Sequence, residues 1–161
     1  MRKYSVTGLG NSLVDILLEV SDQELAELGI DKTSYMLIQE DEQKKLLQKL
    51  SNRESVMQSG GSVANSIFSM NELGASCSFL GCVADDPYGI HFKTEMENCG
   101  VDFPNHPIVG KTTGTTCVMT TPDAERTMRG CLAVTSSYSE KHINEEIIAN
   151  SDWIFIEGFL L

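Results

Sequence analysis

Positive charge is scarce in this sequence, which has 12 Lys and Arg against 23 Asp and Glu in 161 residues and a formal net charge of −11. Nucleic acids and anionic membrane surfaces favour basic proteins, so neither is an expected partner. No apolar run approaches the roughly 20 residues that span a bilayer. The opening residues MRKYSV also lack the apolar core of a signal peptide. We therefore expect a cytoplasmic protein.

Patterns typical of metal and phosphate sites are also missing. The five cysteines are odd in number, form no C-x-x-C pair and have no histidine at ligand spacing. Zinc sites and a disulfide framework are disfavoured, and we expect buried, reduced thiols and no metal site. The Walker A pattern G-x-x-x-x-G-K-[ST] occurs nowhere.

What remains is the composition of an ordinary globular domain, with 41% hydrophobic and 22% charged residues. Apolar and β-branched runs predict strands within residues 4–20, 77–84 and 153–156. Apolar periodicity with capping residues predicts helices over 21–28, 40–50, 62–73, 86–99 and 139–150. This alternation predicts an α/β fold, with a mostly parallel sheet flanked by helices.

Two further features qualify this simple α/β pattern. The β-branched runs 115–121 and 125–128, joined by Pro122-Asp123-Ala124, predict a hairpin and hence a small antiparallel flap. The apolar residues 159–161 carry no polar terminator, so we expect a truncated chain. Docking of these residues on the core is the other explanation.

The glycines Gly8 and Gly10 begin like the G-x-G-x-x-G dinucleotide fingerprint. Leu13 stands where the third glycine belongs, and the following segment has a strand pattern. No helix N-terminus is therefore expected there to bind a pyrophosphate. A dinucleotide-dependent enzyme remains a weaker hypothesis.

Asp15 is the first candidate for ligand binding, because it interrupts the apolar segment LVDILL at residues 13–18. A lone buried carboxylate is costly, so Asp15 must face water, a partner or a ligand. Near the carboxyl ends of the strands, where open α/β sheets bind ligands, it could accept hydrogen bonds from two vicinal hydroxyls. A solvent-facing acid on an edge strand is the alternative.

Two other sites could join Asp15. Gly60 and Gly61 allow the backbone to approach a ligand, and Asn65 in the first turn of the next helix offers an amide. Glu157 follows an apolar strand and so belongs at its carboxyl end. Taken singly, these features also fit a helix N-cap and a solvated loop acid.

The remaining candidates are weaker. His91, His106 and His142 have no partner in the pattern, and we interpret them as surface or packing residues. We expect Arg126 and Arg129 to be solvated on the hairpin. A lid arginine that closes over an anionic substrate is the alternative.

Several motifs in order resemble the ribokinase-like (PfkB) family. They are GNSLVD at 10–15, SGGSVAN at 59–65, LG at 73–74 and GCVADDPYG at 81–89. The later motifs TGTT at 113–116, ERTM at 125–128 and IEG at 156–158 are most similar to its adenosine-kinase-like sugar kinase branch. Their order and spacing make the resemblance specific.

The resemblance implies a Rossmann-like core with a small β-sheet lid, here about residues 14–22 and 110–131. It implies phosphoryl transfer from Mg-ATP to a hydroxymethyl group of a sugar or nucleoside. It also implies that residues of this chain bind or shape the site for the substrate: Asn11, Asp15, Gly60, Gly61, Asn65 and Glu157.

Two further family motifs have no match: the D-T-x-G-A-G-D-like loop with the catalytic aspartate, and the Mg-linked N-x-x-E. Residues 1–161 thus correspond to an N-terminal half, which we expect to hold neither ATP nor Mg²⁺, contribute no catalytic residue and be inactive alone. A stand-alone ligand-binding or partner module is the alternative. Because Arg129-Gly130-Cys131 replaces a tyrosine-containing stretch, the choice of sugar or nucleoside stays open.

A sheet that stops at an unpaired strand should expose apolar surface and backbone groups. We therefore expect self-association. A homodimer through the lid or through the exposed sheet edge would be one form of it.

Overall fold

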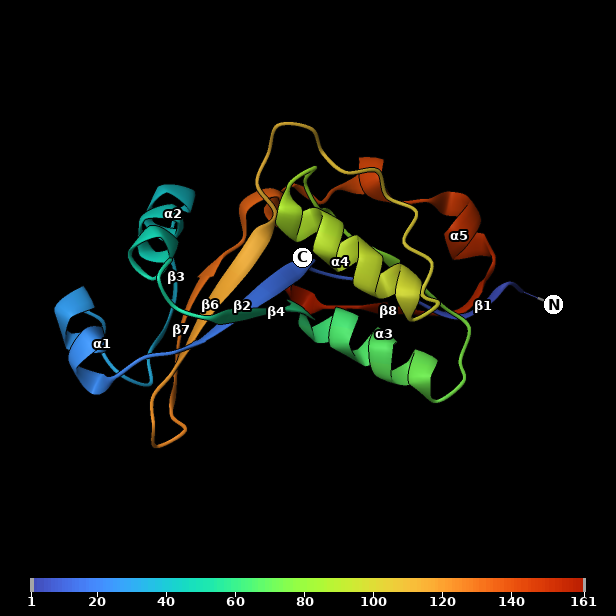
Figure 1. Ribbon diagram of the computed structural model, residues 1–161. Helices are drawn as coiled ribbons and strands as arrows, with labels where there is room; N and C mark the ends of the chain where they lie inside the picture. The colour runs from blue at the N-terminus through green and yellow to red at the C-terminus, as the bar shows by residue number, and fades with distance from the viewer. Residues whose placement is uncertain (1, 161) are drawn as a thin grey trace.

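The structure, a computed structural model, describes residues 2–160 and contains two sheets (Figure 1). The first is a three-stranded parallel sheet with the order β5-β1-β8. Its strands are β1 (Tyr4–Leu9), β5 (Cys77–Leu80) and β8 (Ser151–Ile156). Helices α3 (Ser62–Glu72) and α4 (Pro87–Asn98) lie side by side against it, and the short α5 (Glu145–Ala149) packs beside β1 and β8.

The second sheet has five strands in the order β3-β7-β6-β2-β4, and its pairings are mixed. β2 runs parallel to β6 and antiparallel to β4, while β6 and β7 form an antiparallel hairpin and β3 adds parallel to β7. The strands are β2 (Leu13–Glu19), β3 (Tyr35–Leu37), β4 (Ser55–Gly60), β6 (Gly114–Thr120) and β7 (Arg126–Cys131).

One face of this second sheet is covered by α1 (Asp22–Leu28) and α2 (Glu40–Lys49). Alternate residues of β2, including Ile16 and Leu18, are buried in a cluster with Leu25 of α1 and Leu46 of α2. Successive side chains of a strand point to opposite faces, so Asp15 lies on the other face. That face is less buried, as the alternating burial of β2 shows.

Local sequence chemistry explains where the helices begin and end. Ser21 forms a capping box at the start of α1, and Gly29 ends it with φ 68°. At α4 the Asp86 side chain accepts a hydrogen bond from the Gly89 amide, and Pro87 occupies the first turn. The ring of Phe92, on the buried side of α4, contacts the rings of Phe79 in β5 and of Phe103.

The α/β fold class is confirmed, but three local expectations are wrong. The helix expected over 139–150 is broken into η2 (Glu140–His142) and α5, because Asn144 caps a new helix within it. Cys99 is exposed, while the other four cysteines are buried. Arg129 is only 7% exposed and donates to the Ser34 carbonyl, whereas Arg126 is exposed as expected.

Four elements were not expected from the sequence: β3, β4, η1 (Ala133–Ser137) and η3 (Gly158–Leu160). β3 and β4 join the second sheet alongside strands from the two segments expected to form a lid. Whether this sheet acts as a lid stays a prediction. Among residues 2–160, no helix combines the length and apolar character needed to cross a bilayer.

Strand β8 lies at an end of the first sheet and is exposed on both of its faces. Within residues 2–160 it pairs with β1 and with no other strand. Large apolar side chains remain exposed here, with Trp153 at 76% and Phe155 at 39%. Because such an edge offers both unpaired backbone groups and apolar surface, it is available for pairing with another chain.

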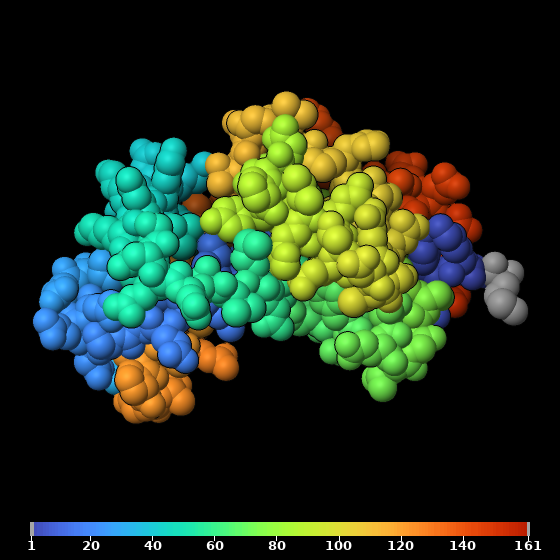
Figure 2. All heavy atoms as spheres, viewed as in Figure 1, coloured from blue at the N-terminus to red at the C-terminus, as the bar shows by residue number. Residues whose placement is uncertain are grey.

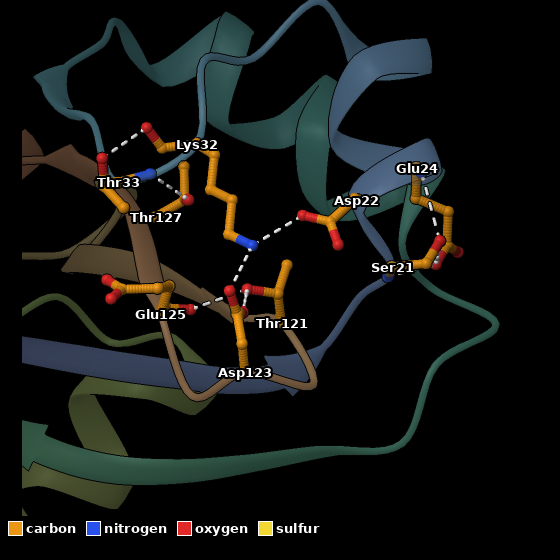
Figure 3. A network of polar contacts seen from close by, with 9 residues as sticks. All are labelled: Ser21, Asp22, Glu24, Lys32, Thr33, Thr121, Asp123, Glu125 and Thr127. Carbon is orange, nitrogen blue, oxygen red and sulfur yellow. Dashed lines mark hydrogen bonds and ion pairs between the residues drawn. The ribbon is translucent and has the colours of Figure 1, made fainter.

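A network of polar contacts fastens α1 to the tip of the β6–β7 hairpin (Figure 3). Lys32 Nζ lies 2.7 Å from Asp22 Oδ1 and 2.7 Å from Asp123 Oδ2. The Thr121 hydroxyl donates to the other oxygen of Asp123 at 2.6 Å. Hydrogen bonds from Lys32 and Thr121 lower the pKa of Asp123 from 3.8 to about 2.

This network predicts a defined pH dependence. A depressed pKa means that the ionised Asp123 stabilises the fold above about pH 4, and that this contribution is lost as the pH falls toward 2. The stability difference between the wild type and Asp123→Asn should therefore shrink over this interval. Urea unfolding at a series of pH values measures it, with Asp41→Asn, an exposed acid of α2, as the control. A constant difference down to pH 2 would contradict the prediction.

Candidate functional site

The Glu157 carboxylate lies at the carboxyl end of β8 and is 8% exposed. Its Oε1 accepts hydrogen bonds from the Asn11 backbone amide at 2.6 Å and from Asn11 Nδ2 at 2.5 Å. Its Oε2 accepts one from the Ser62 hydroxyl at 2.7 Å. Three donors therefore compensate the burial of this charge, and they join β8 to the β1–β2 connection and to the start of α3.

Asn11 is held from its other side as well. The Thr135 hydroxyl donates to Asn11 Oδ1 at 3.2 Å and accepts a hydrogen bond from the Ser12 amide at 3.0 Å. Asn11, Ser12 and Thr135 are all buried. Because both ends of the Asn11 amide are bonded within the protein, its visible role is to shape the site.

The glycine bend between β4 and α3 is tightly enclosed. Gly61 caps α3 with φ 110°, a conformation that side chains rarely adopt, and a Cβ there would collide with the Asn11 carbonyl oxygen. A Cβ on Gly60 would lie 2.7 Å from Asp15 Oδ2 and 2.9 Å from its Cγ. Both glycines therefore allow a close approach, Gly61 to Asn11 and Gly60 to the Asp15 carboxylate.

Asp15 is half-buried on the open face of the second sheet, between Gln58 of β4 and Thr116 of β6. Burial raises the pKa of Asp15, while the Thr116 hydroxyl and the charge of Arg126 act in the opposite direction. A carboxylate has about four acceptor positions, so Asp15 retains capacity to accept hydrogen bonds from a ligand.

Asn65 lies one helical turn beyond the bend, and its backbone amide donates to the Gly61 carbonyl at 2.9 Å. Its side chain is exposed and lines a groove between α3 and α4, together with Gln58, Ser59 and Glu95. Gln58 is the sheet partner of Asp15, but Asp15 itself does not line this groove. Figure 2 shows the surface hollowed between the β6–β7 hairpin and α3.

The structure thus brings Asn11, Gly61 and Glu157 into one buried cluster and sets Gly60 against Asp15. Asn65 lies apart from both groups. Its backbone amide bonds to Gly61, and its side chain shares a groove with Gln58, the sheet partner of Asp15. Ser62 belongs to the SGGSVAN motif but was not named as a site residue, and sequence patterns did not indicate Thr135 or Gln58. Ser62 follows Gly61 directly and could have been suspected from position, whereas Thr135 reaches Asn11 across 124 residues of chain.

The described residues offer little that would bind a metal. Within residues 2–160, no three His, Cys, Asp or Glu side chains gather closely enough to hold an ion. The strand β2, rather than a helix, follows Gly8 and Gly10, and a Cβ on Gly8 would lie 2.6 Å from Ile67 Cγ1 of α3. Gly8 is therefore a packing glycine and not part of a phosphate-binding turn.

The arrangement of a parallel core and a second sheet is similar to that of solved kinase structures. The adenosine kinase from Sinorhizobium meliloti superposes with a TM-score of 0.85 and 31% identity, over 98% of this chain and 48% of that one. A probable sugar kinase from Rhizobium etli gives a TM-score of 0.86 and 26% identity, over 99% and 48%. In sequence, adenosine kinase 2 of Arabidopsis thaliana is 26% identical over 96% of this chain and 46% of its own length.

The family model for pfkB family carbohydrate kinases matches residues 26–161. This chain belongs to that family. It spans about half the length of the relatives named above.

The enclosed bend predicts that Gly61→Ala is strongly destabilising. The alanine meets both an unfavourable φ and the Asn11 carbonyl, so we expect the free energy of unfolding to fall by about 2 to 4 kcal/mol. Gly74→Ala is the matched control, because Gly74 also has a positive φ, 94°, but no atom within 4 Å of a Cβ. The free energy of unfolding of Gly74→Ala should fall by only about 1 to 2 kcal/mol. Equal losses by urea denaturation would contradict the prediction.

Proposed function

We propose that this chain is the substrate-binding half of an ATP-dependent sugar or nucleoside kinase, whose acceptor is a hydroxymethyl group. The observation that supports this most directly is the placement of Asp15 against Gly60, with the Asn65 groove beginning at the neighbouring Gln58. A half-buried carboxylate and an exposed amide suit vicinal hydroxyls, because one accepts hydrogen bonds and the other both donates and accepts them.

Asp15, Gly60, Gly61 and Asn65 would contact the substrate hydroxyls in this proposal, and Asn11 and Glu157 would form the floor beneath them. The role of the chain is to orient the acceptor. Phosphoryl transfer depends mainly on positioning and on stabilising charge, so an oriented hydroxyl is a substantial part of the catalysis. Closure of the second sheet as a lid, about residues 14–22 and 110–131, would exclude water from the transfer.

The family resemblance implies ATP and Mg²⁺ for the complete enzyme. Within residues 2–160, no three candidate ligands gather at one place, although Mg²⁺ at phosphoryl-transfer sites needs only one or two carboxylates beside the phosphates. We place both the nucleotide and the metal in the part of the relatives' length that this chain does not span, and we expect the chain alone to be inactive. A cytoplasmic location remains a prediction.

A stand-alone ligand-binding or partner module is the second candidate function. The exposed β8 edge favours it, since a strand with unpaired backbone groups accepts a complementary strand from another polypeptide. The two candidates differ in whether a second polypeptide restores phosphoryl transfer.

Ligand titration tests the site. By isothermal titration calorimetry the chain should bind adenosine or ribose, and Asp15→Ala and Asn65→Ala should each weaken binding by about ten-fold. Asp41→Ala, an exposed acid of α2, is the control and should bind like the wild type. The chain should transfer no phosphoryl group from Mg-ATP by itself. Unchanged affinity in both site variants would refute the assignment, as would the absence of binding by the wild type.

Self-association tests the exposed strand. We expect concentration-dependent dimers or larger species by sedimentation velocity, and Trp153→Lys should reduce them because a charged side chain on an edge strand opposes pairing. Val109→Lys is the matched control, since Val109 is 79% exposed but lies outside β8. A monomeric wild type at high concentration would exclude this mode, and equal effects of the two variants would assign association to general hydrophobicity.

A further inference from the structure

The glycine bend is anchored to the core through a side chain that the sequence motifs do not include. β4 is an edge strand of the second sheet, and the Ser59 amide donates not to a strand but to Glu95 Oε2 of α4, at 2.8 Å. Ser59 is 5% exposed, so its amide requires a partner. The Glu95 carboxylate thus replaces the neighbouring strand that β4 lacks among the described residues.

Glu95 is itself held in place. His91, one turn earlier on α4, has its Nε2 at 3.1 Å from the same Glu95 Oε2. That Nε2 atom is buried and forms no hydrogen bond among the described residues, so its contact with Glu95 is an ion pair only when His91 is protonated. The helix that carries both side chains is fixed by the buried Phe92 and Met96 and by the Asp86 cap.

The hydrogen bond between Glu95 and the Ser59 amide lies next to the candidate site. Ser59 directly precedes Gly60, which faces the Asp15 carboxylate, and Gly61, which packs on Asn11. Glu95 also lines the groove into which Asn65 projects. A single carboxylate on a core helix therefore sets the position of the bend at which the second sheet meets the core.

We propose that Glu95 is a positioning residue that holds the end of β4, and with it the Gly60–Gly61 bend, in the geometry that binds substrate. The inference rests on the proposed function. Glu95 acts through the Ser59 amide and needs no contact with the substrate. Its action requires an acceptor oxygen at this place, which a glutamine also provides.

Three variants of the chain test the anchor. By amide hydrogen exchange followed by NMR, Glu95→Ala should accelerate exchange at Ser59 by about ten-fold and weaken adenosine binding by about five-fold. Glu95→Gln keeps an acceptor for the amide and should restore both values to near those of the wild type. Glu97→Ala removes an exposed acid of the same helix, whose carboxylate pairs with Lys93, and should change neither.

The outcomes separate the anchor from a general structural role. Unchanged Ser59 exchange in Glu95→Ala overturns the proposal, and so does equal impairment of Glu95→Ala and Glu95→Gln. Faster exchange with unaltered adenosine affinity also overturns it, because the bend then needs no anchor for binding. If the wild type binds neither adenosine nor ribose, the proposed function fails, and exchange at Ser59 and Gly61 alone decides whether Glu95 holds the bend.

Discussion

The buried Glu157 carboxylate is the constraint on which the rest of the site depends. A charge so removed from water is tolerable only when its lone pairs are used, and here both oxygens accept hydrogen bonds from Asn11 and Ser62. Those donors lie where the chain leaves the first sheet for the second and where α3 begins. The same acid therefore ties the β1–β2 connection to the start of α3, next to the glycine bend that faces Asp15.

Much of this arrangement could be predicted from the sequence, because it is encoded by local chemistry. The two glycines before Ser62 indicate a helix start with a close backbone approach, and Asp86 before Pro87 indicates another helix start. The interruption of an apolar run by Asp15 indicates a strand with one polar position, which the alternating burial of β2 confirms. Placing Asp15 near the glycine bend required only the ordinary behaviour of an α/β sheet, whereas Asn65 lies apart from Asp15, on the groove between α3 and α4.

The unpredicted parts are those that long-range pairing decides. β4 has four exposed residues and no apolar pattern, and it becomes a strand because β2 offers it a partner. The three-residue β3 depends in the same way on β7. Arg126 and Arg129 are odd-spaced on one strand and so point to opposite faces, but the sequence does not say that Ser34 would accept from Arg129. The helix expected over 139–150 failed because Asn144 also had strong capping potential.

The bare β8 edge has a consequence for residues 1–161 when they are produced by themselves. A strand that exposes Trp153 and Phe155 while its backbone groups await a partner resembles the surfaces that chaperones and proteases recognise. Residues 1–161 prepared in isolation would then persist only as long as something covers that strand. The yield of such a preparation reports on how well the strand is shielded as much as on how much was synthesised.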